Sequence, residues 1–260
     1  MSIDLKIISD LRERTGAGVS DCQKALIEAN GQIELAIEIL RKKGEIKAAK
    51  KSDRATKEGL VALARGENKV AAVVLSCETD FVSRNSDFQA TTQSFADKLL
   101  SDGTDGFAAW AEGVIKNELV VKIGENIKLS DFGIIESPII GSYLHANKKV
   151  AGVVALVGGN QELANEIAMQ VAAMSPRYIK SEDVAKEEID KEVEIYREQL
   201  KNEGKPENLW EKIITGKLAK YYEEICLLDQ IYIKDDSKKI SDLIADAGVD
   251  SIKEFKKFQA

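Results

Sequence analysis

The chain has 260 residues, 44% of them hydrophobic and 31% charged, and its 37 Lys and Arg against 44 Asp and Glu give a net charge of −7. Its apolar runs are shorter than the roughly 20 residues of a membrane-spanning helix, and its acidic excess argues against nucleic-acid binding, which needs a basic surface. Three widely separated cysteines and one histidine fit neither a disulfide framework nor a zinc site. Because the first residues lack the features of a signal or transit peptide, we expect a cytoplasmic protein with no membrane partner.

Residues 1–44 are predicted to form three short helices that pack as a small bundle. Apolar residues recur there at helical spacing in three stretches, which glycine-containing breaks separate. Ser20 followed by Gln23 fits a capping box at the start of the second helix, and Gly44 is interpreted as the end of the third. Helices this short are marginal alone, so each must cover the apolar face of another.

Residues 45–57 lose this periodicity and are rich in basic side chains. These are Lys47, Lys50, Lys51, Arg54 and Lys57. Cations spread out without interleaved aromatic residues are weak evidence for nucleic-acid contact. We therefore favour a solvated, partly helical linker over a nucleic-acid-binding segment.

A β-hairpin followed by a helix is predicted twice in the next part of the chain. The predicted elements are strands at 60–65 and 70–75 with a helix around 88–99, then strands at 142–144 and 150–157 with a helix around 163–174. The runs Lys69–Val74 and Lys149–Val154 also match each other in sequence. The pattern predicts an α+β core of two pseudo-duplicated subdomains, one at 58–139 and the other at 140–180 together with 223–260.

Residues 181–222 predict an antiparallel helical hairpin. An apolar seam on its first helix faces a stripe on its second, and Gly204–Pro206 turns the chain between them. The seam and the stripe comprise Ile189, Val193, Tyr196 and Leu200, then Leu209, Ile213, Leu218 and Tyr221. A thin hairpin of this coiled-coil type buries little, so we expect it to project from the core. Beyond it, the pattern predicts a strand over 224–233, a short helix over 240–244 and a last strand-like stretch ending at Ala260.

The sequence offers few candidates for catalysis. His145 lies in the second predicted β-hairpin with no cysteine nearby in sequence, so a structural, hydrogen-bonded histidine is favoured over a catalytic base. Cys22 and Cys77 follow apolar faces, which is typical of small core residues. The chain also lacks the glycine-rich phosphate-binding motifs. We therefore expect neither a cofactor nor a metal ion.

Four residues, Thr79, Asp80, Phe81 and Val82, lie at a corner between a buried strand and a helix. In one interpretation, Thr79 or Asp80 caps the helix and Phe81 fills the core. In the other, the charged and aromatic side chains project from the corner and Phe81 anchors a partner. The local pattern alone favours the first interpretation.

Two longer motifs resemble the signatures of a known family, translation elongation factor Ts. The run Leu11–Leu26 is similar to the amino-terminal signature of that family, and Cys77–Arg84 is similar to its second signature. The runs Lys122–Ile127 and Gly141–His145 also match. The resemblance extends over nearly the whole chain in the expected order.

This resemblance implies a guanine-nucleotide exchange factor that acts on elongation factor Tu, without catalytic chemistry, cofactor or direct nucleic-acid contact. It implies that elongation factor Tu is bound both with GDP and free of nucleotide. The family fold is a UBA-like three-helix module, a linker, a core of two related subdomains and a protruding coiled coil. By resemblance, Asp80 and Phe81 enter beside the nucleotide site of elongation factor Tu and disturb the binding of Mg²⁺ and phosphate. Ile123 and Gly124 match positions that support this contact.

Three residues of the first module match the family's other contact face. Arg12, Val19 and Ser20 correspond to the surface with which that module grips the GTPase domain of elongation factor Tu. The coiled coil is implied to reach a further domain of the same partner.

Two alternatives remain from other functional classes. A ubiquitin-type binding scaffold would use residues 1–44 and would not need Asp80 and Phe81. A small-molecule enzyme would use His145 or Cys77 and would turn over substrate alone. Both leave the paired signatures unexplained.

Overall fold

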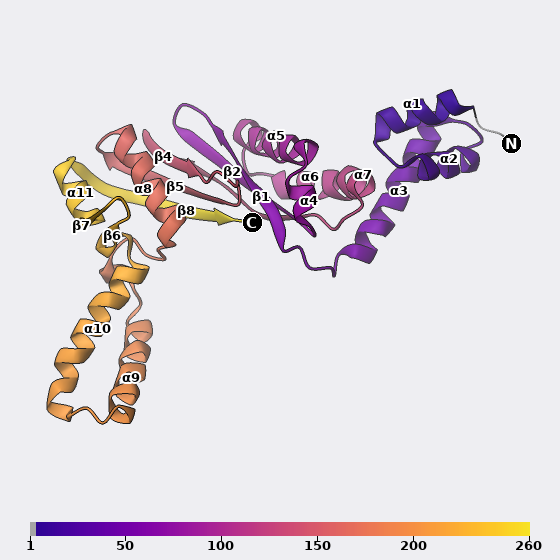
Figure 1. Ribbon diagram of the computed structural model, residues 1–260. Coiled ribbons are helices and arrows are strands. Elements are labelled where there is room, and N and C mark those ends of the chain that lie inside the picture. The colour runs from indigo at the N-terminus through magenta and orange to yellow at the C-terminus, as the bar shows by residue number, and fades with distance from the viewer. Residues whose placement is uncertain (1–3) are drawn as a thin grey trace.

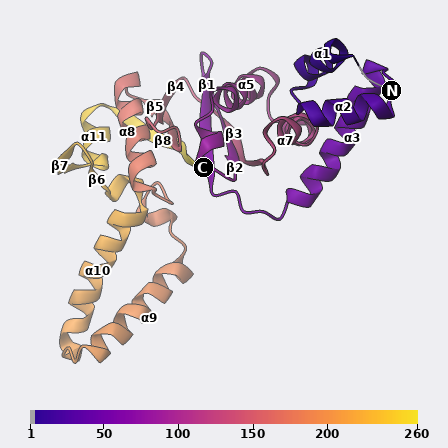
Figure 2. The ribbon, with the colours of Figure 1, turned by 45° about the vertical axis from the view of Figure 1, so that its right-hand side comes forward.

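The computed structural model describes residues 4–260, so residues 1–3 of the predicted first unit lie outside the described residues. A unit of three helices lies at one end of a core of two sheets, and a helical hairpin extends from the other end (Figures 1 and 2). The prediction of an α+β fold with three N-terminal helices and antiparallel sheets is confirmed.

The N-terminal unit is a small helical bundle with its own core. It comprises α1 (Leu5–Thr15), α2 (Val19–Glu28) and α3 (Ile33–Lys51). Leu11, Cys22 and Leu26 are fully buried between the helices. The predicted capping box is wrong: α2 begins directly after Gly18 and no side chain caps it, because Ser20 already lies inside its first turn.

Helix α3 is longer than the sequence predicted, because Gly44 does not end it. The helix continues to Lys51, so the first part of the predicted linker is helical. Gly44 is buried where α3 passes the π-helical turn η1 (Ile115–Leu119), and a Cβ at this position would lie 2.4 Å from Val121 Cγ2. The missing side chain therefore permits a close approach of two helices.

The core contains two three-stranded antiparallel sheets that repeat one topology. The elements of the first half are β1 (Glu58–Arg65), β2 (Lys69–Cys77), α4 (Asp80–Ser83), α5 (Ser86–Asp102), α6 (Phe107–Val114), η1, α7 (Val120–Ile123) and β3 (Lys128–Glu136). Those of the second half are β4 (Ile139–Leu144), β5 (Val150–Gly158), α8 (Gln161–Met174), β6 (Ile231–Tyr232), β7 (Asp235–Lys239), α11 (Ile240–Asp246) and β8 (Val249–Gln259). The sheet orders are β1-β2-β3 and β4-β5-β8, so in each half a hairpin is followed by a helix and then by a third strand. The third strand of the first half, β3, was not predicted, whereas the predicted strand-like stretch ending at Ala260 corresponds to β8.

The two sheets pack face to face, and helices cover their outer faces. Val74 of β2 and Val153 of β5 lie in the apolar cluster between the sheets, whereas Val73 lies in the cluster beneath α5. The sequence match that aligned Val73 with Val153 is therefore not a structural equivalence, because a shift of one residue turns every side chain of a strand to its opposite face. The duplication lies in the topology.

The helical hairpin consists of two antiparallel helices that extend away from the core (Figures 1 and 2). Its elements are η2 (Ser181–Asp183), α9 (Lys186–Asn202), η3 (Glu207–Leu209), α10 (Trp210–Ile225) and η4 (Leu227–Asp229). Leu200 and Ile214 are buried between the helices, whereas Leu209 precedes α10 and is 44% exposed. The predicted strand over 224–233 is largely wrong: α10 continues to Ile225, and the buried run after it forms a turn before the short strand β6.

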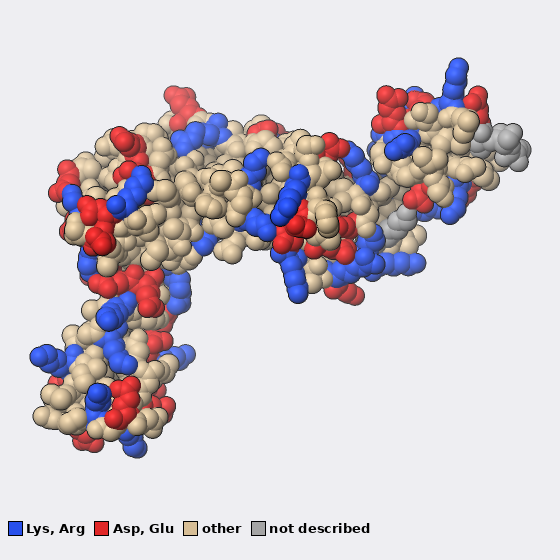
Figure 3. Space-filling model, viewed as in Figure 1, with Lys and Arg blue, Asp and Glu red and all other residues tan. Residues whose placement is uncertain are grey.

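Acidic and basic side chains are interspersed over the face of the molecule that Figure 3 shows. Both signs occur on the core, on the hairpin and on the N-terminal unit. A mixed surface of this kind agrees with the modest net charge of −7.

Candidate functional site

The corner between β2 and α4 presents Phe81 to solvent. Strand β2 ends at Cys77, which is fully buried, and α4 is a single turn that begins at Asp80. Phe81 is 82% exposed, whereas Phe88 and Phe95 are each 1% exposed. The interpretation in which Phe81 fills the core is therefore wrong.

The two polar residues of this corner do not cap α4 with their side chains. Thr79 occupies the N-cap position in extended conformation, but its hydroxyl donates a hydrogen bond of 2.6 Å to Glu125 Oε1. Asp80 forms an ion pair of 3.1 Å with Arg84, and both side chains are exposed. Since an exposed ion pair contributes only about 0–1 kcal/mol, the Asp80 carboxylate can exchange this partner for another at little cost.

Glu125 holds the backbone of the corner from the loop after α7. Its Oε2 accepts hydrogen bonds from the backbone N–H groups of Glu78 and Thr79, each at 3.0 Å. Glu78 returns the contact, because its Oε1 accepts the backbone N–H of Asn126 at 2.7 Å. We call these four residues, Glu78, Thr79, Glu125 and Asn126, the corner clamp. Hydrogen bonds to charged groups are the stronger ones, so the clamp fixes the direction in which α4 leaves the sheet.

Ile123 and Gly124 lie beside this corner, at the end of the short helix α7. Gly124 ends α7 in the left-handed region, with φ 83°, which turns the chain back toward the clamp. Its carbonyl oxygen accepts a hydrogen bond from Lys51 Nζ at the end of α3. Ile123 and Val82 are half-buried and pack against the same hydrophobic core. The structure thus brings the two predicted segments together.

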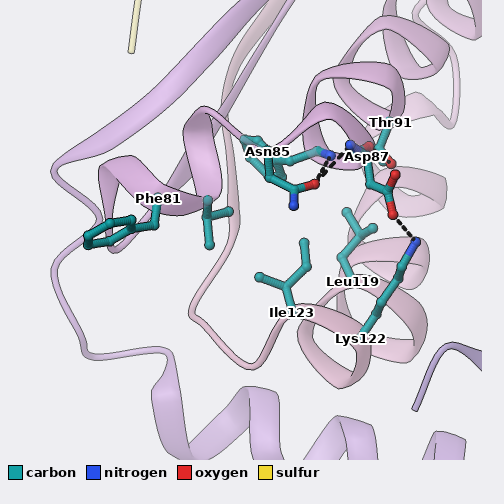
Figure 4. Close-up of a pocket in the computed structure, with 9 residues that line it drawn as sticks. Phe81, Asn85, Asp87, Thr91, Leu119, Lys122 and Ile123 are labelled. Atoms are coloured by element: carbon teal, nitrogen blue, oxygen red, sulfur yellow. Dashed lines mark hydrogen bonds and ion pairs between the residues drawn. The ribbon is translucent and has the colours of Figure 1, made fainter. Parts of the chain in front are cut away.

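A hollow of about 360 Å³ opens next to Phe81. Figure 4 shows the Phe81 ring at one edge of it, pointing away from Leu119 and Lys122. The lining residues are Phe81, Val82, Asn85, Asp87, Phe88, Thr91, Leu119, Lys122 and Ile123. Asn85 caps α5, and an ion pair of 3.0 Å between Asp87 and Lys122 closes the far side. Space of this size with an apolar floor is sufficient for side chains of a partner.

The three predicted contact residues of the N-terminal unit form a separate surface. Arg12, Val19 and Ser20 are all exposed, Val19 by 50%. They belong to α1 and α2, which lie apart from the Phe81 corner (Figure 1).

The residues considered for catalysis lie elsewhere. Cys22, Cys77 and Cys226 are fully buried, and burial raises the pKa of Cys77 and of Cys226 to about 12. His145 is exposed, and its Nδ1 lies 3.0 Å from the Tyr143 hydroxyl. Within residues 4–260, His, Cys, Asp and Glu form no group of three or more that could hold a metal ion. The helices of this same part of the chain are too short or too polar to span a membrane.

The sequence pattern does not predict the corner clamp. Glu125 and Asn126 belong to a run that matched the family, but the pattern gave them no role. The available signal was the position of Glu125 directly after a glycine that ends a helix. That signal does not say which distant backbone the carboxylate reaches.

Residues 78–260 match the family model described as "Elongation factor TS". A protein named elongation factor Ts from a Hydrogenobaculum species is 42% identical over 272 aligned positions, which cover 100% of this chain and 99% of that protein. The chain belongs to the elongation factor Ts family. Its relatives include the elongation factors Ts of Marinobacter nauticus (41% identity, 96% of this chain and 89% of that protein) and Hahella chejuensis (40%, 95% and 88%).

The elongation factor Ts match begins at the corner clamp. The family model starts at Glu78, directly after β2, and covers β3, the second sheet and the hairpin, while alignment with the relatives extends over β1, β2 and the N-terminal helices as well. The chain is thus related to factors of translation elongation in protein biosynthesis over its whole described length.

Proposed function

We propose that the chain promotes guanine-nucleotide exchange on elongation factor Tu, in the cytoplasm, without covalent chemistry or a cofactor of its own. The observation that supports this most directly is the 82% exposure of Phe81 on a corner that Glu125 holds fixed. A large aromatic side chain that stays exposed forgoes the favourable free energy of burial. Binding to a partner would recover this free energy. Aromatic anchors of this kind carry much of the binding energy at protein interfaces.

In the proposed mechanism, the Phe81 corner enters elongation factor Tu beside its nucleotide site. Phe81 separates elements of the GTPase domain, and Asp80 leaves Arg84 to contact the partner. The hollow next to Phe81 receives partner side chains, with Ile123 and Gly124 supporting the contact. This displacement disturbs the groups that hold Mg²⁺ and phosphate, so GDP leaves and GTP binds in its place.

Thermodynamic linkage sets the size of the effect. If the chain binds nucleotide-free elongation factor Tu more tightly than the GDP-bound form, it must weaken GDP by the same factor. A thousandfold weakening corresponds to a coupling of about 4 kcal/mol. Burying one Phe supplies about 1.5–3 kcal/mol, so the lost coordination of Mg²⁺ has to supply the remainder.

The outlying parts of the chain hold the partner in place in this proposal. The three-helix unit (residues 1–44), as a UBA-like module, grips the GTPase domain through Arg12, Val19 and Ser20. The hairpin (residues 181–222), as a coiled coil, reaches a further domain. These contacts raise affinity, while the Phe81 corner accelerates release.

Stopped-flow release of a fluorescent GDP from elongation factor Tu tests the proposal. We expect the wild-type chain to accelerate release and Phe81→Ala to slow the accelerated rate by an order of magnitude or more, with an unchanged circular dichroism spectrum. Met174→Ala, at another exposed apolar residue (44% exposed), should behave as wild type. An unchanged rate with Phe81→Ala would remove this residue from the mechanism, and no acceleration by the wild type would overturn the function.

A further inference from the structure

The helical hairpin joins the core through two short chain crossings. The residues before α9 and those after α10 run side by side there: Leu227 N–H donates to Tyr178 O at 2.9 Å, and Tyr178 N–H donates to Ile225 O at 3.0 Å. Each helix has 16 or 17 residues, which is a length of about 25 Å at 1.5 Å per residue. A small rotation at these crossings therefore moves the hairpin tip by several ångströms.

One carboxylate connects the groups that meet at this base. Glu188, in the first turn of α9, accepts a hydrogen bond from the Tyr178 hydroxyl at 2.7 Å and one from the Tyr221 hydroxyl at 2.5 Å. Arg177 pairs with the same carboxylate through Nη1 to Oε1 at 2.9 Å and Nη2 to Oε2 at 3.2 Å. The partners come from the chain before α9 and from the C-terminal part of α10. Glu188 thus ties both helices of the hairpin to the segment that leads into the core.

The surroundings of Glu188 restrict the geometry of its contacts at the base of the hairpin. Its side chain is 23% exposed, and a small apolar cluster containing Val184, Ile225 and Cys226 lies at the same base, with Tyr178 and Tyr221 packed against it. Bidentate pairing with an arginine restricts geometry more than a single contact does. Hydrogen bonds from both tyrosines, Tyr221 first, hold the pKa of Glu188 below its ordinary value, so the carboxylate stays charged at neutral pH.

We propose that Glu188 is a positioning residue that fixes the direction of the helical hairpin relative to the core. The hairpin has its own buried contacts, at Leu200 and Ile214, so its helices do not need Glu188 to form. What Glu188 adds is a rigid base. A rigid lever binds a partner without the entropy cost of ordering a mobile one. This last consequence rests on the proposed exchange function, whereas the rigidity itself does not.

Distance measurement between two spin labels tests the rigidity in the full chain. Labels are attached at Glu203→Cys, at the end of the hairpin, and at Glu162→Cys, on α8 of the core; both positions are exposed. We expect one narrow distance distribution for the otherwise wild-type chain and at least a twofold wider one for Glu188→Ala, with unchanged helix content. Glu187→Ala is the matched control, since Glu187 lies in the same turn of α9 and is exposed.

A second variant separates orientation from folding. Tyr178→Phe combined with Tyr221→Phe removes the two hydroxyl donors and keeps the apolar packing, so it should widen the distribution even if Glu188→Ala does not fold. Distributions as narrow as wild type in both variants would overturn the proposal.

The exchange assay gives the functional readout. If Glu188 positions the hairpin, Glu188→Ala should raise the chain concentration at half-maximal GDP release by about fivefold or more. The maximal rate should stay within about twofold of the wild-type rate. A wider distribution with an unchanged half-maximal concentration would overturn the consequence for exchange. If the wild-type chain accelerated nothing, the proposed function would fail, and the distance widths would still decide whether Glu188 fixes the hairpin.

Discussion

The Glu125 carboxylate and the Thr79 hydroxyl, 46 residues apart in sequence, form a hydrogen bond of 2.6 Å that joins the loop after α7 to the start of α4. The same carboxylate accepts the backbone N–H of Thr79 at 3.0 Å. Phe81 stands two residues further along, on a helix of a single turn that cannot be stable by itself. The direction of the exposed ring is therefore set by a side chain from another part of the core.

Replacing Glu125 with Ala should loosen this corner. It leaves the backbone N–H groups of Glu78 and Thr79 without their acceptor, and losing a hydrogen bond to a charged group costs about 1.5–3 kcal/mol. We expect the free energy of unfolding, from urea denaturation, to fall by this amount, and the rate of stimulated GDP release to fall because Phe81 no longer holds one direction. Glu67→Ala, in the exposed turn between β1 and β2, should change neither. Wild-type values of both quantities for Glu125→Ala would contradict the role of the clamp.

The three thiols should be unreactive in the folded chain. Cys22, Cys77 and Cys226 are fully buried, and burial raises the pKa of Cys77 and Cys226 to about 12 and raises that of Cys22 as well. A raised pKa favours the neutral thiol, so at pH 8 a group with pKa about 12 is ionised to only about one part in 10⁴.

Ellman's reagent at pH 8 measures this directly. We expect negligible reaction of the native chain within minutes and reaction of all three thiols in guanidinium chloride. The variant Glu203→Cys, with its new thiol at an exposed position, should react at once and to the extent of one thiol per chain. Rapid reaction of the native wild type would show that one of the buried cysteines becomes accessible through local opening.

Periodicity and local motifs predicted the fold class, the three N-terminal helices and the two β-hairpins, because these features are written in short stretches of sequence. The errors came where a distant contact decides. Gly44 predicts a helix end, but α3 continues through it, and the glycine is needed because a side chain there would collide with Val121. The apolar run after Glu224 predicts a strand, but a short apolar run without alternation does not distinguish a strand from a buried turn. The prediction therefore failed there.

At the candidate site too, local sequence predicts some features and distant contacts decide the others. The motif at Thr79–Val82 drew attention to the corner, but composition alone favoured a buried Phe81. Its exposure depends on the clamp, and Glu125 reaches the corner across 46 residues of sequence. A single sequence specifies such a contact without revealing it.

Gly44→Ala should displace the N-terminal unit from the core. The new Cβ would lie 2.4 Å from Val121 Cγ2 and 3.1 Å from the carbonyl oxygen of Lys116. The first contact is too short to tolerate, and the second involves backbone that cannot rotate away. Forcing a methyl group into such packing costs about 1–3 kcal/mol, so α3 has to separate from η1 and α7.

Hydrogen–deuterium exchange measures this separation. We expect faster exchange of backbone amides over residues 115–123 in Gly44→Ala, together with a larger radius of gyration in X-ray scattering. Gly216→Ala is the matched control: Gly216 lies inside α10 with nothing within 4 Å of the added Cβ, so the same substitution there should stabilise the hairpin by about 0.5–1 kcal/mol. If Gly44→Ala exchanged no faster than wild type over 115–123, α3 would have room for a side chain at this crossing. Close packing of α3 against the core would then not be what holds the N-terminal unit, with its residues Arg12, Val19 and Ser20, in place.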